Sequence, residues 1–97
     1  MAKGYWLARL DIKDRNGFAE YRQRNAAPLA KFGGRFLVRG GKADTVFGPA
    51  RAENVVIEFD SYAQAVACFQ SAEYQAAAQY LQASCETIEF VIVEGAE

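Results

Sequence analysis

A chain of 97 residues is long enough for one domain, which we expect to span residues 1–97, and too short for two. Aliphatic and aromatic residues make up 52% of the chain, which excludes a disordered protein. The net charge of −1 comes without a basic stripe and the apolar runs are short, so we expect no partner among nucleic acids or membranes.

Residues 4–12, GYWLARLDI, alternate between two faces and therefore predict a strand. One face is purely apolar and consists of Trp6, Ala8, Leu10 and Ile12. The other face is mixed and consists of Tyr5, Leu7, Arg9 and Asp11. This pattern is typical of a strand that helices cover on one side only. No signal peptide is recognisable before it, so we expect a cytoplasmic protein.

An amphipathic helix should follow this strand. The pattern recurs at three- and four-residue steps and consists of Phe18, Tyr21, Asn25, Leu29 and Phe32. Asp14 is placed to cap the helix, and Gly33 and Gly34 should end it, because glycine adopts the left-handed C-cap conformation easily. Pro28 should kink or interrupt the helix, since its ring clashes with the preceding turn.

Two further strands are expected at residues 35–40 and 55–59. In the first of these strands, one face should carry the side chains of Phe36 and Val38, and the other face those of Arg35, Leu37 and Arg39. The second should face the helices with Val55, Ile57 and Phe59, and the opposite side with Val56 and Glu58. A polar stretch that begins at Gly40 and Gly41 connects the two strands.

Ser61 should cap a second helix, and its spacing to Gln64 fits a capping box. Ser71 should restart this helix after a break. A last strand is expected at residues 86–94. It should point inward with Ile88, Phe90 and Ile92, and outward with Glu89, Val91 and Val93.

The element order βαββαβ predicts an α+β, ferredoxin-like fold, with an antiparallel four-stranded sheet and two helices on one face. The third strand should lie between the first and the second. The other sheet face, which we call the open face, is left uncovered although it carries many apolar side chains. Since the chain has no spare helix, we predict a homodimer that pairs through the open face, as in a dimeric α+β barrel.

The absence of histidine excludes Ser-His-Asp and Cys-His chemistry within one chain, and also zinc or haem ligation by histidine. The two cysteines, Cys68 and Cys85, are far apart and form no metal site by themselves. A disulfide between them is possible in principle, but thiols normally stay reduced in the cytoplasm. We therefore predict no metal and no cofactor, and interpret Cys68 as a small buried hydrophobe.

Several blocks resemble the bacterial domain-of-unknown-function family 1330. They are GYWLARLDIKD, LAKFGGRFLVRGGK, VVIEFDSYAQA, SAEYQAA and FVIVEG, and they span residues 3–95. That family is similar in fold to the dimeric α+β barrels, which include cofactor-free monooxygenases, haem-degrading enzymes and muconolactone isomerase-like proteins. The resemblance implies a fold and a dimer but no particular reaction.

Four charged residues are expected on the open face, namely Arg9, Asp11, Arg39 and Glu58, with Glu58 in reach of Arg9 or Arg39. One interpretation is a ligand pocket inside the dimer, in which Arg9 and Arg39 bind a carboxylate or carbonyl group. Asp11 or Glu58 would then transfer protons as the catalytic residue. The alternative is a structural ion-pair network that fixes the register of the dimer.

Tyr74, which the resemblance singles out within SAEYQ, is a further candidate for ligand binding near the mouth of the pocket. Alternatively, its ring packs in the helix with the hydroxyl group at the surface. Trp6 is expected in the core. The run RGGK at residues 39–42 favours a turn over a phosphate site, because it lacks Walker spacing and opens no helix.

Two functions remain open. The first is a small-molecule-binding dimer or an enzyme that acts on a small organic acid, of the isomerase or cofactor-independent oxygenase type. The second is a non-catalytic structural or accessory dimer. An interior without a ligand-sized cavity would favour the second.

Overall fold

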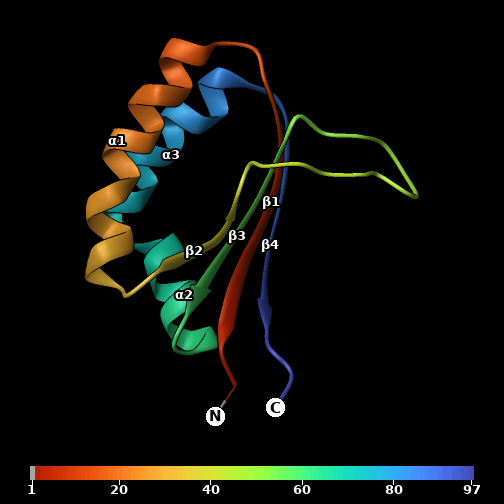
Figure 1. Cartoon of the computed structure of the whole chain (residues 1–97). Helices are drawn as coiled ribbons and strands as arrows, with labels where there is room; N and C mark the ends of the chain where they lie inside the picture. Colours follow the sequence, from red (N-terminus) through yellow and green to blue (C-terminus); the bar gives the residue numbers. More distant parts are fainter. Residues whose placement is uncertain (1) are drawn as a thin grey trace.

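The computed structural model describes residues 2–97, in which three helices cover one face of an antiparallel four-stranded sheet (Figure 1). In chain order the elements are β1 (Gly4–Ile12), α1 (Arg15–Lys31), β2 (Arg35–Arg39), β3 (Glu53–Phe59), α2 (Tyr62–Gln70), α3 (Ala72–Ser84) and β4 (Cys85–Glu94). The strands lie in the order β2-β3-β1-β4, so β3 separates β1 from β2 as predicted. The ferredoxin-like arrangement is confirmed.

The core lies between the helices and the face of the sheet predicted to be apolar. Trp6, in the central strand β1, is 1% exposed and packs against the rings of Phe59, Tyr74 and Phe90. Its indole Nε1 donates a hydrogen bond of 2.9 Å to the carbonyl oxygen of Ala65 in α2. This bond satisfies the polar atom of a buried ring, and the core role predicted for Trp6 is confirmed.

The first helix begins and ends as predicted, but it runs through Pro28 without interruption. The carboxylate of Asp14 accepts hydrogen bonds from the amides of Asn16 and Gly17 at its start, and Gly33 follows its end with φ of 76°. The expected interruption at Pro28 is therefore wrong, while the kink stays a prediction. Pro28 lies in the last turn, where only one helical hydrogen bond is lost, and its buried ring packs in the core.

The second helical region is broken at Ser71, as predicted. The hydroxyl of Ser71 donates to the carbonyl oxygen of Cys68 at 2.7 Å and accepts from the amide of Tyr74 at 3.2 Å. One side chain thus ends α2 and caps α3. Cys68 is fully buried, which confirms its interpretation as a small core residue.

Strand β2 contains a bulge that reverses the faces of its last residues. Phe36 pairs with Ile57, but Val38 rather than Leu37 pairs with Val56, because the register shifts between Phe36 and Val38. After the extra residue, each side chain of β2 points to the sheet face opposite to the one that simple alternation predicts. Val38 therefore lies on the open face and Arg39 on the face toward the helices, and both predictions for these two residues are wrong.

Large apolar side chains remain exposed on the open face. They include Leu7, Leu37, Val38, Val91 and Val93, each between 37% and 55% exposed. Residues 40–52, which we call the arm, connect β2 to β3 and project from the sheet on the side away from the helices (Figure 1). Within residues 2–97, no helix has the length and apolar character needed to cross a bilayer.

Candidate functional site

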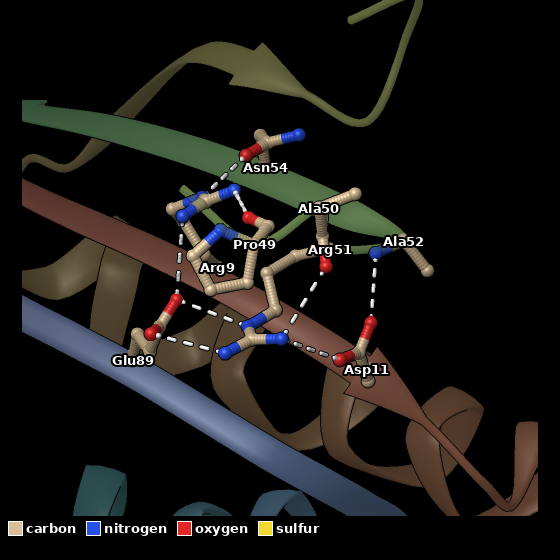
Figure 2. A network of polar contacts seen from close by, with 8 residues as sticks. All are labelled: Arg9, Asp11, Pro49, Ala50, Arg51, Ala52, Asn54 and Glu89. Atoms are coloured by element: carbon tan, nitrogen blue, oxygen red, sulfur yellow. Dashed lines mark hydrogen bonds and ion pairs between the residues drawn. The ribbon is translucent and has the colours of Figure 1, made fainter. Parts of the chain in front are cut away.

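The first group of charges on the open face ties the arm to the sheet (Figure 2). Arg51 binds both carboxylate oxygens of Glu89, from Nε at 3.1 Å and from Nη2 at 3.2 Å, and reaches Asp11 at 3.3 Å. Arg9 donates to the side chain of Asn54 at 3.2 Å and contacts Glu89 at 3.4 Å. Because Arg51 lies beside it, the pKa of Glu89 is lowered. Each of these charges already has a partner within the chain.

Backbone groups of the arm complete this network. Arg9 donates from Nη2 to the carbonyl oxygen of Pro49 at 2.8 Å, and the carboxylate of Asp11 accepts from the amide of Ala52 at 2.9 Å. Arg9 and Asp11, both predicted site residues, therefore hold the returning limb of the arm in place.

Glu58 belongs to a second group at the other end of the open face. Its carboxylate accepts hydrogen bonds from Arg35 at 3.0 and 3.3 Å and from the hydroxyl of Tyr5 at 3.0 Å. These hydrogen bonds, the larger effect coming from Arg35 and the smaller from Tyr5, lower the pKa of Glu58. The hydrogen bond between Tyr5 and Glu58 in turn raises the pKa of Tyr5. The expectation that Glu58 reaches Arg9 or Arg39 is wrong, since Glu58 pairs with Tyr5 in the ladder while Arg9 pairs with Asn54.

Arg39 lies instead at a cleft between the sheet and α1, on the face toward the helices. Its guanidinium group stacks on the ring of Phe36 at 4.2 Å from the ring centre. The walls are mainly apolar and include Trp6, Leu10, Phe18, Phe36, Leu81 and Phe90. Polar groups reach the cleft from Tyr21, Arg22, Asn25, Arg39 and Glu53. The cavity in this cleft measures about 60 Å³.

The two arginines of the cleft differ from the other arginines of the chain. Arg9, Arg15, Arg24, Arg35 and Arg51 each bind a carboxylate. Within residues 2–97, the side chains of Arg22 and Arg39 form neither an ion pair nor a hydrogen bond. Both are exposed to solvent, so two guanidinium forks are available beside a mostly apolar cavity.

Glu53 contributes the carboxylate of the cleft. It begins β3 and is bound to Arg15 of α1 at 3.3 Å, so an ion pair joins the sheet to the helix at this point. The backbone of Gly40, with φ of 74°, passes close to this carboxylate, and a Cβ atom at position 40 would lie 2.9 Å from it. Glycine therefore permits both the turn out of β2 and the close approach to Glu53.

Tyr74 is fully buried, so neither interpretation of its hydroxyl was correct. The hydroxyl lies 2.8 Å from that of Tyr21, and the ring packs edge-on against Trp6. Burial raises the pKa of both tyrosines, and for Tyr21 hydrogen bonds with Tyr74 and Asn25 oppose this effect. Tyr74 thus contributes to the wall behind the cleft, whereas Tyr21 lines the cleft itself.

Of the residues predicted for a site, Arg39 lines this cleft, while its neighbours Tyr21, Arg22 and Glu53 were not predicted. Arg22 follows the apolar position Tyr21 in the helix pattern and looks like an ordinary solvent-facing residue. Its distinguishing feature is the absence of a partner, which depends on the tertiary structure. Within residues 2–97, no three Asp, Glu or Cys side chains gather in an arrangement that fits a metal ion.

The chain belongs to the family called domain of unknown function DUF1330, whose model matches residues 3–96. No curated protein was found to match the sequence. Among solved structures, the chain is similar to a protein of unknown function from Rhodopseudomonas palustris, with a TM-score of 0.81 and 16% identity over 99% of this chain and 84% of the other.

Two further structures share the fold at equally low identity. One is a dimeric ferredoxin-like protein of unknown function from Jannaschia, with a TM-score of 0.66, 16% identity, and coverage of 94% of this chain and 97% of the other. The other is SnoaB, a cofactor-independent oxygenase from Streptomyces nogalater, with a TM-score of 0.68, 15% identity, and coverage of 100% and 96%. At such identity these likenesses establish the fold and not the reaction.

Proposed function

We propose that the cleft between α1 and the sheet binds a small organic acid, with Arg22 and Arg39 holding its carboxylate. One observation carries this proposal: within residues 2–97, these are the two arginines whose side chains form no ion pair or hydrogen bond, and both line the same mostly apolar cavity. An unpaired guanidinium group is suited to a carboxylate, which it binds through two parallel hydrogen bonds. The apolar walls suit a hydrocarbon or aromatic body on the same ligand.

The size of the cavity limits the ligand. A volume of about 60 Å³ is well below the several hundred cubic ångströms of most ligand pockets. The acid is therefore small, or Arg22 and Arg39 swing aside as it enters. Both side chains are exposed and unpaired, so their reorientation breaks no ion pair and no hydrogen bond.

For a reaction, we propose the isomerase or cofactor-independent oxygenase type. SnoaB, which has the same fold, is a cofactor-independent oxygenase, and this lends the proposal support by analogy only. Glu53 and the hydroxyl of Tyr21 are the proton-transferring groups that line the cleft. Asp11 and Glu58, the carboxylates expected in this role, have partners on the opposite face of the sheet, and their proposed role is structural.

We also propose a homodimer that pairs through the open face. The exposed apolar residues of that face support it, as does the dimeric description of the similar Jannaschia protein. In this arrangement the network around Arg9 and Arg51 lies at the edge of the interface and sets its register. The cytoplasmic location expected from the sequence stays a prediction.

The small cavity also supports the second candidate, a non-catalytic structural dimer. One experiment separates the two functions. Benzoate is titrated into the ¹⁵N-labelled protein and followed by amide NMR shifts, with benzyl alcohol as the uncharged probe of the same shape. We expect shifts around the cleft with benzoate alone, weakened about tenfold or more by Arg22→Ala and by Arg39→Ala, since each removes a charged hydrogen-bonding group.

Arg24→Ala is the matched control, because Arg24 lies on the same helix but binds Glu20 at 2.8 Å. It should leave benzoate binding unchanged. If benzoate causes no shifts in the cleft, or if Arg24→Ala weakens binding as much as Arg22→Ala, the ligand site is rejected and the structural dimer stands as the better account.

A further inference from the structure

The arm carries the two most exposed large apolar side chains within residues 2–97. Phe47 is 93% exposed and Val46 is 80% exposed, both near the middle of residues 40–52. Loops of this length in a compact domain are uncommon, and those that occur are usually functional. In the isolated protomer Phe47 lies in water and contributes nothing to the core, so its burial elsewhere would release hydrophobic free energy.

The direction of the arm is set by its base. Arg51, whose side chain is only 18% exposed, is held by Glu89 and Asp11, while Pro49 and Ala52 are bound through their backbones to Arg9 and Asp11 (Figure 2). These contacts join the returning limb to β1 and β4 on the open face. A projection anchored in this way loses less conformational entropy when its tip binds a partner than a free loop does.

The arm projects on the side of the open face, away from the helices (Figure 1). A second copy seated on the open face would lie about 10 Å away, the usual spacing of packed sheets. Each limb of the arm has about six residues, which span at most roughly 20 Å when extended. The tip is therefore long enough to cross the gap and to contact the facing copy.

We propose that the tip of the arm, Val46 and Phe47, is a docking element for a second copy of this chain. The proposal rests on the dimer through the open face. The charges of Lys42 and Asp44 before the tip balance each other, and Arg51 at the base is paired with Asp11 and Glu89, so the tip offers an apolar contact and no strong field for a charged partner. The open face supplies a matching apolar surface on the same molecule, which makes the chain complementary to itself.

The test measures the dissociation constant of the dimer by analytical ultracentrifugation of the full chain. Both copies of the variant lose the side chain, so Phe47→Ser should raise it about a hundred- to ten-thousandfold, the value of two buried phenylalanine side chains. Tyr62→Ser, which removes a 43% exposed ring from α2 on the helical side, is the matched control and should leave it unchanged. Circular dichroism of both variants checks that the fold is retained.

A second measurement follows the tip directly. Both native cysteines are buried, so a solvent-sensitive fluorophore on the Phe47→Cys variant reports on that position alone. Its emission should shift to the blue as protein concentration rises through the dimer midpoint. If the dissociation constant does not change in Phe47→Ser and the emission at position 47 does not shift, the docking role of the arm is wrong, while the open-face dimer stands. If the wild-type protein is a monomer at high concentration, both proposals are wrong. A blue shift with lipid vesicles but not with protein concentration also overturns the proposal, in favour of a membrane surface.

Discussion

The buried hydroxyl pair of Tyr21 and Tyr74 should respond unequally to the loss of either oxygen. Within residues 2–97, the hydroxyl of Tyr74 has one partner, Tyr21, at 2.8 Å, whereas Tyr21 also bonds with Asn25. The Tyr21→Phe change leaves the fully buried hydroxyl of Tyr74 and the 4% exposed side chain of Asn25 without that partner. The Tyr74→Phe change breaks one bond of Tyr21 and leaves the other.

These contacts give the magnitudes. A satisfied hydrogen bond contributes about 1 kcal/mol net, while a buried polar group left without a partner costs about 1–3 kcal/mol. We therefore expect Tyr74→Phe to lower the free energy of unfolding by about 1 kcal/mol and Tyr21→Phe by about 2–3 kcal/mol. The double variant should cost less than the sum, with a coupling of about 1 kcal/mol, because it leaves no lone hydroxyl in the pair.

Urea unfolding followed by circular dichroism measures these differences. All variants are compared at one protein concentration, since dimerisation would make the midpoint depend on concentration. Tyr62→Phe is the control, because Tyr62 is 43% exposed and should tolerate the change. Strict additivity of the two changes, or a larger loss for Tyr74→Phe than for Tyr21→Phe, would refute the description of this pair.

Alkaline pH provides a second measurement of the same pair. Burial raises the pKa of Tyr74 and of Tyr21 above 10.0, so both groups stay neutral in the folded protein where the unfolded chain ionises. A group with a raised pKa stabilises the fold fully below its unfolded pKa, and this contribution is lost as pH rises above it. Wild-type stability should therefore fall above about pH 10, and the double phenylalanine variant should fall less steeply.

Three further outcomes follow from single contacts. Gly4→Ala should lower the free energy of unfolding by at least about 2 kcal/mol, because its Cβ would lie 2.5 Å from the carbonyl oxygen of Ser61. Gly33→Ala has open space around it and should lower it by only about 1 kcal/mol, for the left-handed backbone; thermal unfolding measures both. In the wild type, Arg35 and Tyr5 lower the pKa of Glu58, so the stability that its ionised form contributes is lost as the pH falls below about 4.5. Glu58→Gln should therefore lose less free energy of unfolding on acidification, and the same loss in both proteins would contradict this. Burial raises the pKa of Cys68 to about 12, and Cys85 is buried too. A thiol reagent at about pH 8 should therefore react with these thiols only when the chain unfolds. Rapid reaction of the folded chain would refute their burial.

Local patterns in the sequence predicted most of the fold. The alternation in residues 4–12 identified β1 with its correct buried face, because one side of that strand is purely apolar. Asp14, Ser61 and Ser71 identified the starts of all three helices in residues 2–97, since each hydroxyl or carboxylate binds amides within three residues of itself. Such signals depend on neighbours in the sequence and therefore need no tertiary information.

The candidate site was predicted less well, and the bulge in β2 is the main reason. RFLVRG has no residue that marks an irregularity, yet one extra residue at Leu37 transfers Arg39 from the open face to the cleft. Arg51 was missed for a related reason. It lies in a polar connecting segment whose order comes from contacts with Asp11 and Glu89, which are distant in sequence.

The two faces of the sheet use arginine in opposite ways. On the open face, Arg9, Arg35 and Arg51 are all bound to carboxylates, so their charges serve the fold and the base of the arm. On the helical face, Arg22 and Arg39 are unpaired beside an apolar cavity. Because the sheet separates the proposed ligand site from the proposed interface, a change on one face should leave the other intact. The Arg39→Ala variant is therefore expected to lose benzoate binding and remain a dimer. The Phe47→Ser variant is expected to dissociate into protomers that still bind benzoate. Loss of both properties in either variant would mean that the two sites are not independent.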